Sequence, residues 1–140
     1  MNKIIILKKR KDFLRAAKGV RMVVSTAILQ AARSLSEEEV PFKIGFTASK
    51  KIGKAHIRSR AKRRLRAVVR EVFPELALPN VEYVLISRFN TAYCPYQTLK
   101  SDIKWALKKA NKILLAEDQT AEPESTALED SASENSAQVK

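Results

Sequence analysis

Apolar residues recur at helical spacing in three parts of the chain. Between residues 57 and 73 they fall within about 120° of a helical wheel, which predicts an amphipathic helix stopped by Pro74. A second long helix is expected to begin near Pro95, a residue suited to a first helical turn, and to continue through Leu114. A shorter helix is expected over residues 9–18.

Three other stretches have the pattern of strands. Residues 26–33 suit either a strand or a helix, and we favour a strand because a Val-rich segment, residues 20–24, leads into it. Residues 42–50 alternate between apolar and small or polar side chains, which is typical of a half-buried strand. Residues 81–89 contain the run Val84 to Ile86, which suggests burial on both faces.

The order of these elements predicts the fold class. A strand, a helix and another strand follow one another between residues 42 and 89, which is the arrangement of a crossover that joins parallel strands. We therefore expect an α+β fold, namely a small two-layer sandwich with a mixed central sheet of about four strands.

Charge divides the 140-residue chain into two parts. Residues 117–140 hold seven acidic residues, one basic residue and no aromatic residue, so their net charge is −6. A segment of this composition does not bury enough apolar surface to offset its ordering entropy, and we predict a disordered acidic tail. Residues 1–116 carry 26 basic and eight acidic residues, a net charge of +18, and are expected to form one folded domain.

The composition also excludes several classes of protein. Cys94 is the single cysteine, which excludes a disulfide framework and fits a reducing compartment such as the cytoplasm. His56 is the single histidine, so the chain has too few soft ligands for a structural zinc site, and we expect neither a metal site nor a catalytic residue in the protein. No segment approaches 18 apolar residues, so we expect no membrane span. These exclusions favour a binder of polyanions.

The segment from Lys43 to Arg70 contains no acidic residue. Its helical part places cations four residues apart, as in Arg58 and Lys62, and each such pair costs roughly 0.2–0.5 kcal/mol. A helix that needed only solubility would interleave glutamates. Because the arginines that dominate this helix bind phosphate bidentately, we expect a nucleic acid to relieve the repulsion. The candidate RNA-binding residues are Lys50, Lys51, Lys54, Arg58, Arg60, Lys62, Arg63, Arg64, Arg66 and Arg70.

The same segment carries a recognisable motif. Residues 49–66 read Ser-Lys-Lys-Ile-Gly-Lys-Ala-His-Ile-Arg-Ser-Arg-Ala-Lys-Arg-Arg-Leu-Arg. This run resembles the signature S-K-K-x-G-x-A-x-x-R-N-R-x-K-R-x-x-R of the bacterial ribonuclease P protein subunits, with Ser59 in place of the asparagine. The resemblance extends over roughly residues 5–115 and leaves out the acidic tail.

The resemblance implies a function, partners and a fold detail. A protein of this family is a subunit of ribonuclease P, in which a catalytic RNA removes the 5′ leader of precursor tRNA by hydrolysis. The expected partners are that RNA and the precursor tRNA, with no membrane and no stable protein partner required. The expected cofactor is Mg²⁺, held mainly by the RNA. The family's βαβ crossover is left-handed, against the usual preference.

The resemblance also implies a cleft for the leader between the central sheet and the N-terminal helix. In this chain the matching residues are Phe13, Ala17, Gln30 and Ser49. The family often has aromatic residues at the positions that we align with Ala17 and Gln30, so Phe13 is the aromatic that is left to stack on a base.

Two functions from other classes share some of these features. A ribosomal or RNA-chaperone protein would have the basic helix but no dependence on a tRNA leader. An autonomous nuclease would need an acidic metal cluster or a pair of histidines, which the sequence does not offer. For the acidic tail, one hypothesis is that it competes with RNA for the basic helix.

Overall fold

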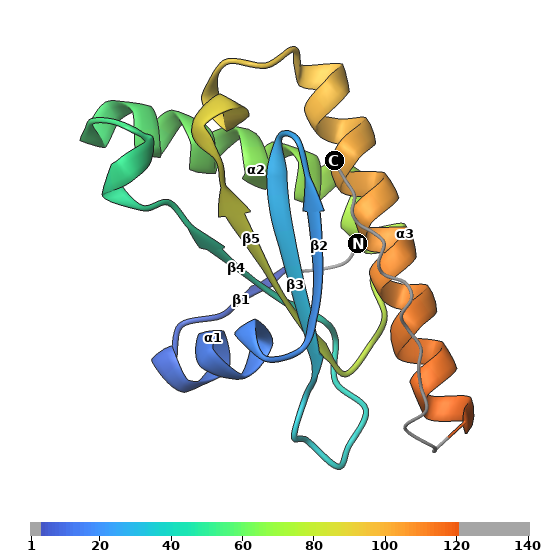
Figure 1. The fold of residues 1–140 in the computed structure, drawn as a ribbon. Coiled ribbons are helices and arrows are strands. Elements are labelled where there is room, and N and C mark those ends of the chain that lie inside the picture. Colours follow the sequence, from blue (N-terminus) through green and yellow to red (C-terminus); the bar gives the residue numbers. More distant parts are fainter. Residues whose placement is uncertain (1–3, 121–140) are drawn as a thin grey trace.

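The computed structural model describes residues 4–120, and side chains as far as Glu117. Its elements in chain order are β1 (Ile5–Ile6), α1 (Arg10–Ala17), β2 (Val20–Val24), β3 (Ala27–Arg33), β4 (Lys43–Thr47), the 3-10 helix η1 (Lys50–Ile52), α2 (Ala55–Leu76), β5 (Val81–Ser87), the 3-10 helix η2 (Phe89–Ala92) and α3 (Tyr96–Thr120). The fold is α+β, as predicted (Figure 1).

The five strands form one mixed sheet in the order β1-β4-β5-β3-β2. Strands β4 and β5 are parallel, so the predicted crossover through α2 is confirmed. Strand β3 runs antiparallel to both of its neighbours, β5 and β2. The sheet has one strand more than the predicted number of about four, and the three strands assigned by residue are β3, β4 and β5, without the two edge strands. Strand β1 has two residues, too few for any periodicity, and the Val-rich residues 20–24 form β2, whose outward residues are exposed.

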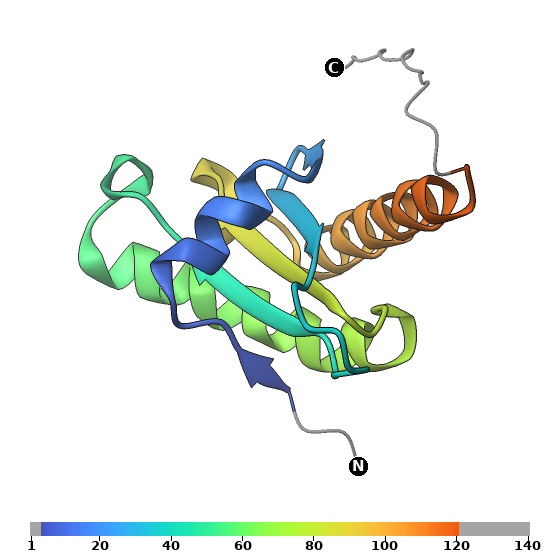
Figure 2. The same cartoon turned by 90° about the horizontal axis from the view of Figure 1, so that it is seen from below.

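Helices cover both faces of the sheet. Leu29, Ile44 and Leu85 point toward α2 and α3 and belong to the main apolar core. Residues one step along the same strands, such as Val84, point to the other face, where α1 packs. Figure 2 shows α1 and α2 on opposite sides of the sheet. The two-layer description therefore fits the sheet with α2 and α3, and α1 adds a short helix on the second face.

Helix α2 does not stop at Pro74, so that prediction was wrong. The helix begins at Ala55 and continues to Leu76, with the proline inside its last turn. A proline in this place removes one backbone donor and clashes with the carbonyl of Arg70, four residues earlier, at a cost in stability. Leu76 and Ala77 pack against the main core, which offsets that cost.

Helix α3 extends further than the sequence indicated. It runs to Thr120, so the first four residues of the segment predicted to be a disordered tail are helical. The remainder of that prediction, residues 121–140, lies outside the described residues.

Buried polar groups connect α2, β5 and α3. The Tyr83 hydroxyl donates to Asn111 Oδ1 (2.6 Å), and the Asn111 side-chain amide donates to the carbonyl of Leu76 (2.7 Å). The backbone N–H of Leu78 donates to the same hydroxyl at 2.9 Å. Burial raises the pKa of Tyr83 to about 12, so the phenol stays protonated and keeps its role as a donor.

Candidate RNA interface

Helix α2 separates apolar and cationic residues along its length. Leu65 and Val68 are fully buried in the core with the sheet and α3, and Ala61 is fully buried against Ile52 and Ala92. The exposed cations of the helix are Arg60, Arg63, Arg66 and Arg70, whereas Arg58, Lys62 and Arg64 are half-buried. Because the buried positions anchor the helix, its solvent side presents guanidinium groups on a rigid support. We call the exposed residues Arg63, Arg66 and Arg70 the arginine surface.

Arg60 and Arg64, two of the predicted RNA-binding arginines, donate to backbone carbonyls of the segment that follows β5. Arg60 Nε donates to the carbonyl of Ala92 at 2.7 Å. Arg64 Nη1 donates to the carbonyl of Thr91 at 2.8 Å, and its Nη2 donates to the carbonyl of Cys94. These carbonyls close η2 and lead into α3, so the two arginines hold that segment against α2. These hydrogen bonds therefore offset part of the like-charge repulsion on the helix before any RNA is bound.

The loop before α2 carries the remaining predicted cations. Lys50, Lys51 and Lys54 are exposed, and Lys54 is the N-cap residue of the helix. Gly53 has a φ of 141°, in the region that favours glycine, and a Cβ there would meet Ile57 at 3.1 Å. Arg58 Nη1 donates to the carbonyl of Gly53 at 2.9 Å, which closes the loop onto the helix.

The arginine surface borders an aromatic side chain of the sheet. The guanidinium carbon of Arg66 lies 5.7 Å from the centre of the Phe46 ring, within the range of a cation–π contact. Phe46, Arg66 and Arg70 line a small hollow of about 150 Å³ together with β1. Arg66 is thus oriented by the sheet while it stays exposed to solvent.

A second hollow, of about 390 Å³, lies between α1 and the end of β4. Its lining residues are Lys8, Arg10, Phe13, Phe46 and Thr47. We call it the α1 hollow. It combines two aromatic rings with two cations, and this combination suits a base and its phosphate.

The structure brings some of the predicted cleft residues together. Phe13 lines the α1 hollow and packs on the backbone of Gly45, where an added Cβ would lie 2.6 Å from its ring. Gln30 is in register with Val84 and Gly45, so it shares this face of the sheet, but it is buried. Ser49 is exposed beyond the end of β4, and Ala17 is exposed at the end of α1. Neither of these two lines the hollow.

Sequence reasoning missed Lys8, Arg10 and Thr47 as residues of this hollow. The four consecutive cations of residues 8–11 were a signal that could have identified Lys8 and Arg10, because they lie next to Phe13 in the sequence. Thr47 follows the alternation of polar and apolar residues along β4. This pattern indicates that its side chain points away from the main core, but it does not indicate which residues pack opposite it.

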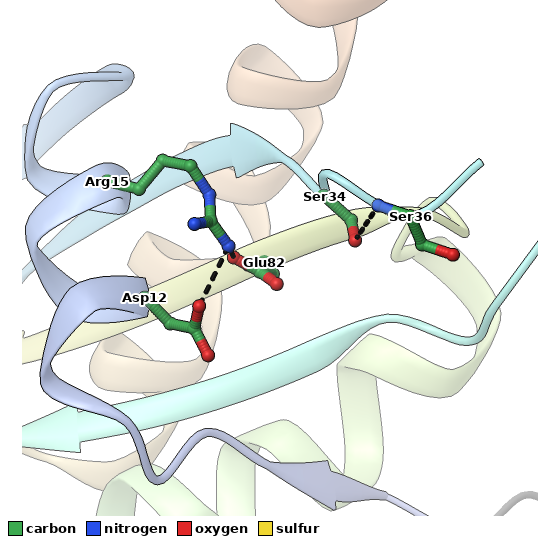
Figure 3. Close-up of polar contacts among 5 residues, drawn as sticks. All are labelled: Asp12, Arg15, Ser34, Ser36 and Glu82. Atoms are coloured by element: carbon green, nitrogen blue, oxygen red, sulfur yellow. Dashed lines mark hydrogen bonds and ion pairs between the residues drawn. The ribbon is translucent and has the colours of Figure 1, made fainter.

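A buried ion pair holds α1 over the sheet. Arg15 Nη2 donates to Glu82 Oε1 on β5 and to Asp12 Oδ1 at 2.9 Å (Figure 3). The Glu82 side chain is 4% exposed and the Arg15 side chain 24%. Burial alone would lower the pKa of Arg15, but its hydrogen bonds to Glu82 and Asp12 outweigh burial and raise it. The pair places Phe13, which precedes Arg15 by two residues, against β4.

Two kinds of feature do not occur among the described residues 4–120, a metal-binding cluster and a helix able to cross a membrane. In that range no three side chains of the types His, Cys, Asp or Glu lie close enough together to hold a metal ion. None of the helices there combines the length and the apolar character that crossing a membrane requires.

Comparison with known proteins gives one consistent family. The family model described as ribonuclease P matches residues 1–111. The ribonuclease P protein component of Ruegeria pomeroyi is 43% identical over 107 residues, which are 76% of this chain and 86% of that protein. The corresponding protein of Paramagnetospirillum magneticum is 39% identical over 110 residues, covering 76% of this chain and 83% of that protein.

Two solved structures have the same fold. The RNase P protein of Staphylococcus aureus superposes with a TM-score of 0.63 at 23% identity, covering 77% of this chain and 96% of that one. The RNase P protein from Thermotoga maritima also gives a TM-score of 0.63, at 20% identity, covering 74% of this chain and 94% of that one.

Proposed function

The chain belongs to the ribonuclease P protein family, and on this premise we propose how its surface is used: the arginine surface and the lysines before α2 bind the catalytic RNA, and the α1 hollow receives the 5′ leader of precursor tRNA. As a member of the family, the protein is a subunit of ribonuclease P, an endoribonuclease of tRNA processing. The observation that carries the proposal is the continuous run without a carboxylate from Lys43 to Arg70, displayed on one anchored helix and its loop.

The two halves of the surface suit different parts of an RNA. Arg63, Arg66 and Arg70 stand on a rigid helix and match the phosphates of a folded RNA, which lie at fixed positions. The α1 hollow offers the ring of Phe13 beside Lys8 and Arg10, which suits an unpaired nucleotide with its base and phosphate both accessible. A single-stranded leader has such nucleotides.

The metal of the reaction belongs to the RNA in this proposal. Mg²⁺ prefers carboxylate and other hard oxygen ligands, and the stretch from Lys43 to Arg70 has no carboxylate. The RNA-facing residues therefore do not fit a magnesium site, and we assign them positioning and charge neutralisation only. The single cysteine, Cys94, supports action in a reducing compartment, and we place the protein in the cytoplasm.

The central test is cleavage of precursor tRNA by the catalytic RNA at low Mg²⁺, with and without the protein. We expect the protein to raise kcat/KM at least about tenfold, the lower end of what electrostatic recruitment supplies. The protein alone is expected to cleave nothing. Cleavage by the protein alone would support an autonomous nuclease, and equal stimulation of substrates with a one-nucleotide leader and with a longer leader would support an RNA chaperone. Either result would contradict the proposal.

Phe13→Ala tests the α1 hollow. Loss of one base-stacking contact is expected to weaken binding of precursor tRNA to the holoenzyme about 5- to 100-fold, while binding of leaderless tRNA stays the same. Leu14→Ala is the matched control, since Leu14 is the next residue of α1 and is 52% exposed. Because Phe13 also packs on Gly45, thermal unfolding of each variant is measured alongside. An equal loss for both tRNAs would contradict a role in leader binding.

A further inference from the structure

Two aromatic side chains, one on η2 and one directly after it, are unusually open to solvent. Phe89 is 70% exposed and Tyr93 is 57% exposed. Their ring centres lie 5.7 Å apart with an interplanar angle of 46°, so the two rings contact each other at one site on the surface. Exposed aromatic pairs add nothing to a core, and a contiguous apolar patch of this kind is typical of a binding site.

The pair is held rigidly against α2. Between the two residues, Ala92 is buried in a cluster with Ile52 of η1 and Ala61 of α2. Arg60 and Arg64 bind the carbonyls on either side of this point, as described above. Figure 1 shows η2 beside the first part of α2. The rings therefore stand next to the cationic helix in a fixed position, not on a free loop.

Arginines flank the pair, and one carboxylate lies nearby: Asp102 accepts from the Thr26 hydroxyl at 2.8 Å, and the Thr26 carbonyl accepts from the Thr91 hydroxyl of η2. Residues 83–101 contain no aspartate or glutamate, and Arg88 directly precedes Phe89. Arg88 Nη1 donates to the carbonyl of Val24 at 2.9 Å, and the Thr91 hydroxyl accepts from the Arg88 backbone N–H at 2.7 Å, so this end of η2 is also fixed. An apolar patch within positive charge suits a partner that has both flat rings and negative charge.

We propose that Phe89 and Tyr93 form a stacking platform for an unpaired base of the RNA whose phosphates contact α2. The proposal rests on the proposed function and extends it to a surface that the motif of residues 49–66 does not include. Rings stack on any base, and the neighbouring Arg60 and the arginine surface attract the phosphates that flank it. The occupant is a nucleotide of the catalytic RNA, because the segment that carries the rings is held against the helix assigned to that RNA.

The double variant Phe89→Ala/Tyr93→Ala tests the platform in the full-length chain. Dissociation constants are measured at several salt concentrations, in one arm with the catalytic RNA transcript and in the other with precursor tRNA added to the preformed holoenzyme. We expect a loss of about 5- to 100-fold in the arm with the catalytic RNA, with an unchanged slope of log K against log salt. A loss confined to the arm with precursor tRNA would overturn the proposed occupant. Stacking neutralises no phosphate, so a changed slope would overturn the proposal.

Two controls separate stacking from other roles. Phe89→Leu/Tyr93→Leu keeps apolar side chains but removes the flat rings, and is expected to lose as much affinity as the alanine pair. Trp105→Ala removes another aromatic residue, 52% exposed on α3, and is expected to change neither arm. Full affinity of the alanine pair, in a preparation where the unmodified protein binds the RNA, would overturn the platform while leaving the proposed function intact. No binding by the unmodified protein would instead count against the proposed function.

A second copy of this chain is the alternative occupant of the pair, and the same variants decide between the two. Sedimentation of the free protein is measured with and without the alanine substitutions. A dimer that disappears in the variant, together with unchanged RNA affinity in both arms, would overturn the proposal in favour of self-association.

Discussion

Replacing Arg63, Arg66 and Arg70 together with glutamine is expected to weaken binding of the catalytic RNA by about 10²- to 10³-fold at 50 mM salt. Each cation that neutralises a phosphate contributes about 0.9 to the slope of log K against log salt, so the slope should fall by about 2 to 3. The three residues are exposed, and they make none of the hydrogen bonds that hold η2, so the fold should be retained. Fluorescence anisotropy with labelled RNA, at four or more salt concentrations, measures both quantities.

A matched control removes the same charge from another helix. Lys104, Lys108 and Lys112 are exposed on α3, and changing all three to glutamine lowers the net charge equally. If the arginine surface is the RNA site, this control keeps most of the affinity and most of the slope. Equal losses in the two triple variants would mean that RNA responds to net charge alone, and the assigned surface would be wrong.

The second large effect concerns stability. Arg15→Ala is expected to lower the free energy of unfolding by about 3 kcal/mol, because it leaves the buried carboxylate of Glu82 without its partner. The figure is at the lower end for a buried pair, since the Arg15 side chain is 24% exposed and Lys43 lies in register with Glu82 on the adjacent strand. Urea unfolding followed by circular dichroism gives the free energy.

A second substitution distinguishes the charge from the packing. In the Arg15→Ala background, Glu82→Gln removes the unpaired charge and is expected to recover a large part of the lost stability. Arg15→Ala should also reduce leader binding, because α1 carries Phe13 and is held over the sheet by this pair. A loss of less than about 1 kcal/mol would show that apolar packing around Ala16 holds α1 without the ion pair.

The Arg60 and Arg64 contacts change how the charge pattern of α2 is interpreted. From spacing alone, every cation between Arg58 and Arg70 counted as an unneutralised group awaiting a polyanion. In the folded chain, carbonyls of residues 91, 92 and 94 accept from two of them. The repulsion argument therefore applies with most force to Arg63, Arg66 and Arg70, which is why the first prediction uses those three.

Local patterns in the sequence determined the long helices, the three inner strands, the parallel β4-α2-β5 crossover and the cationic character of α2. These follow from periodicity and charge within about 20 residues, and such short-range properties are visible along the chain. Tertiary structure alone decided the pairing of β1 with β4, the passage of α2 through Pro74, and the α1 hollow with Lys8 and Arg10. It also decided which arginines hold η2. Each of these depends on contacts between residues far apart in the sequence, and the energies of such contacts cannot be predicted from the spacing of neighbouring residues.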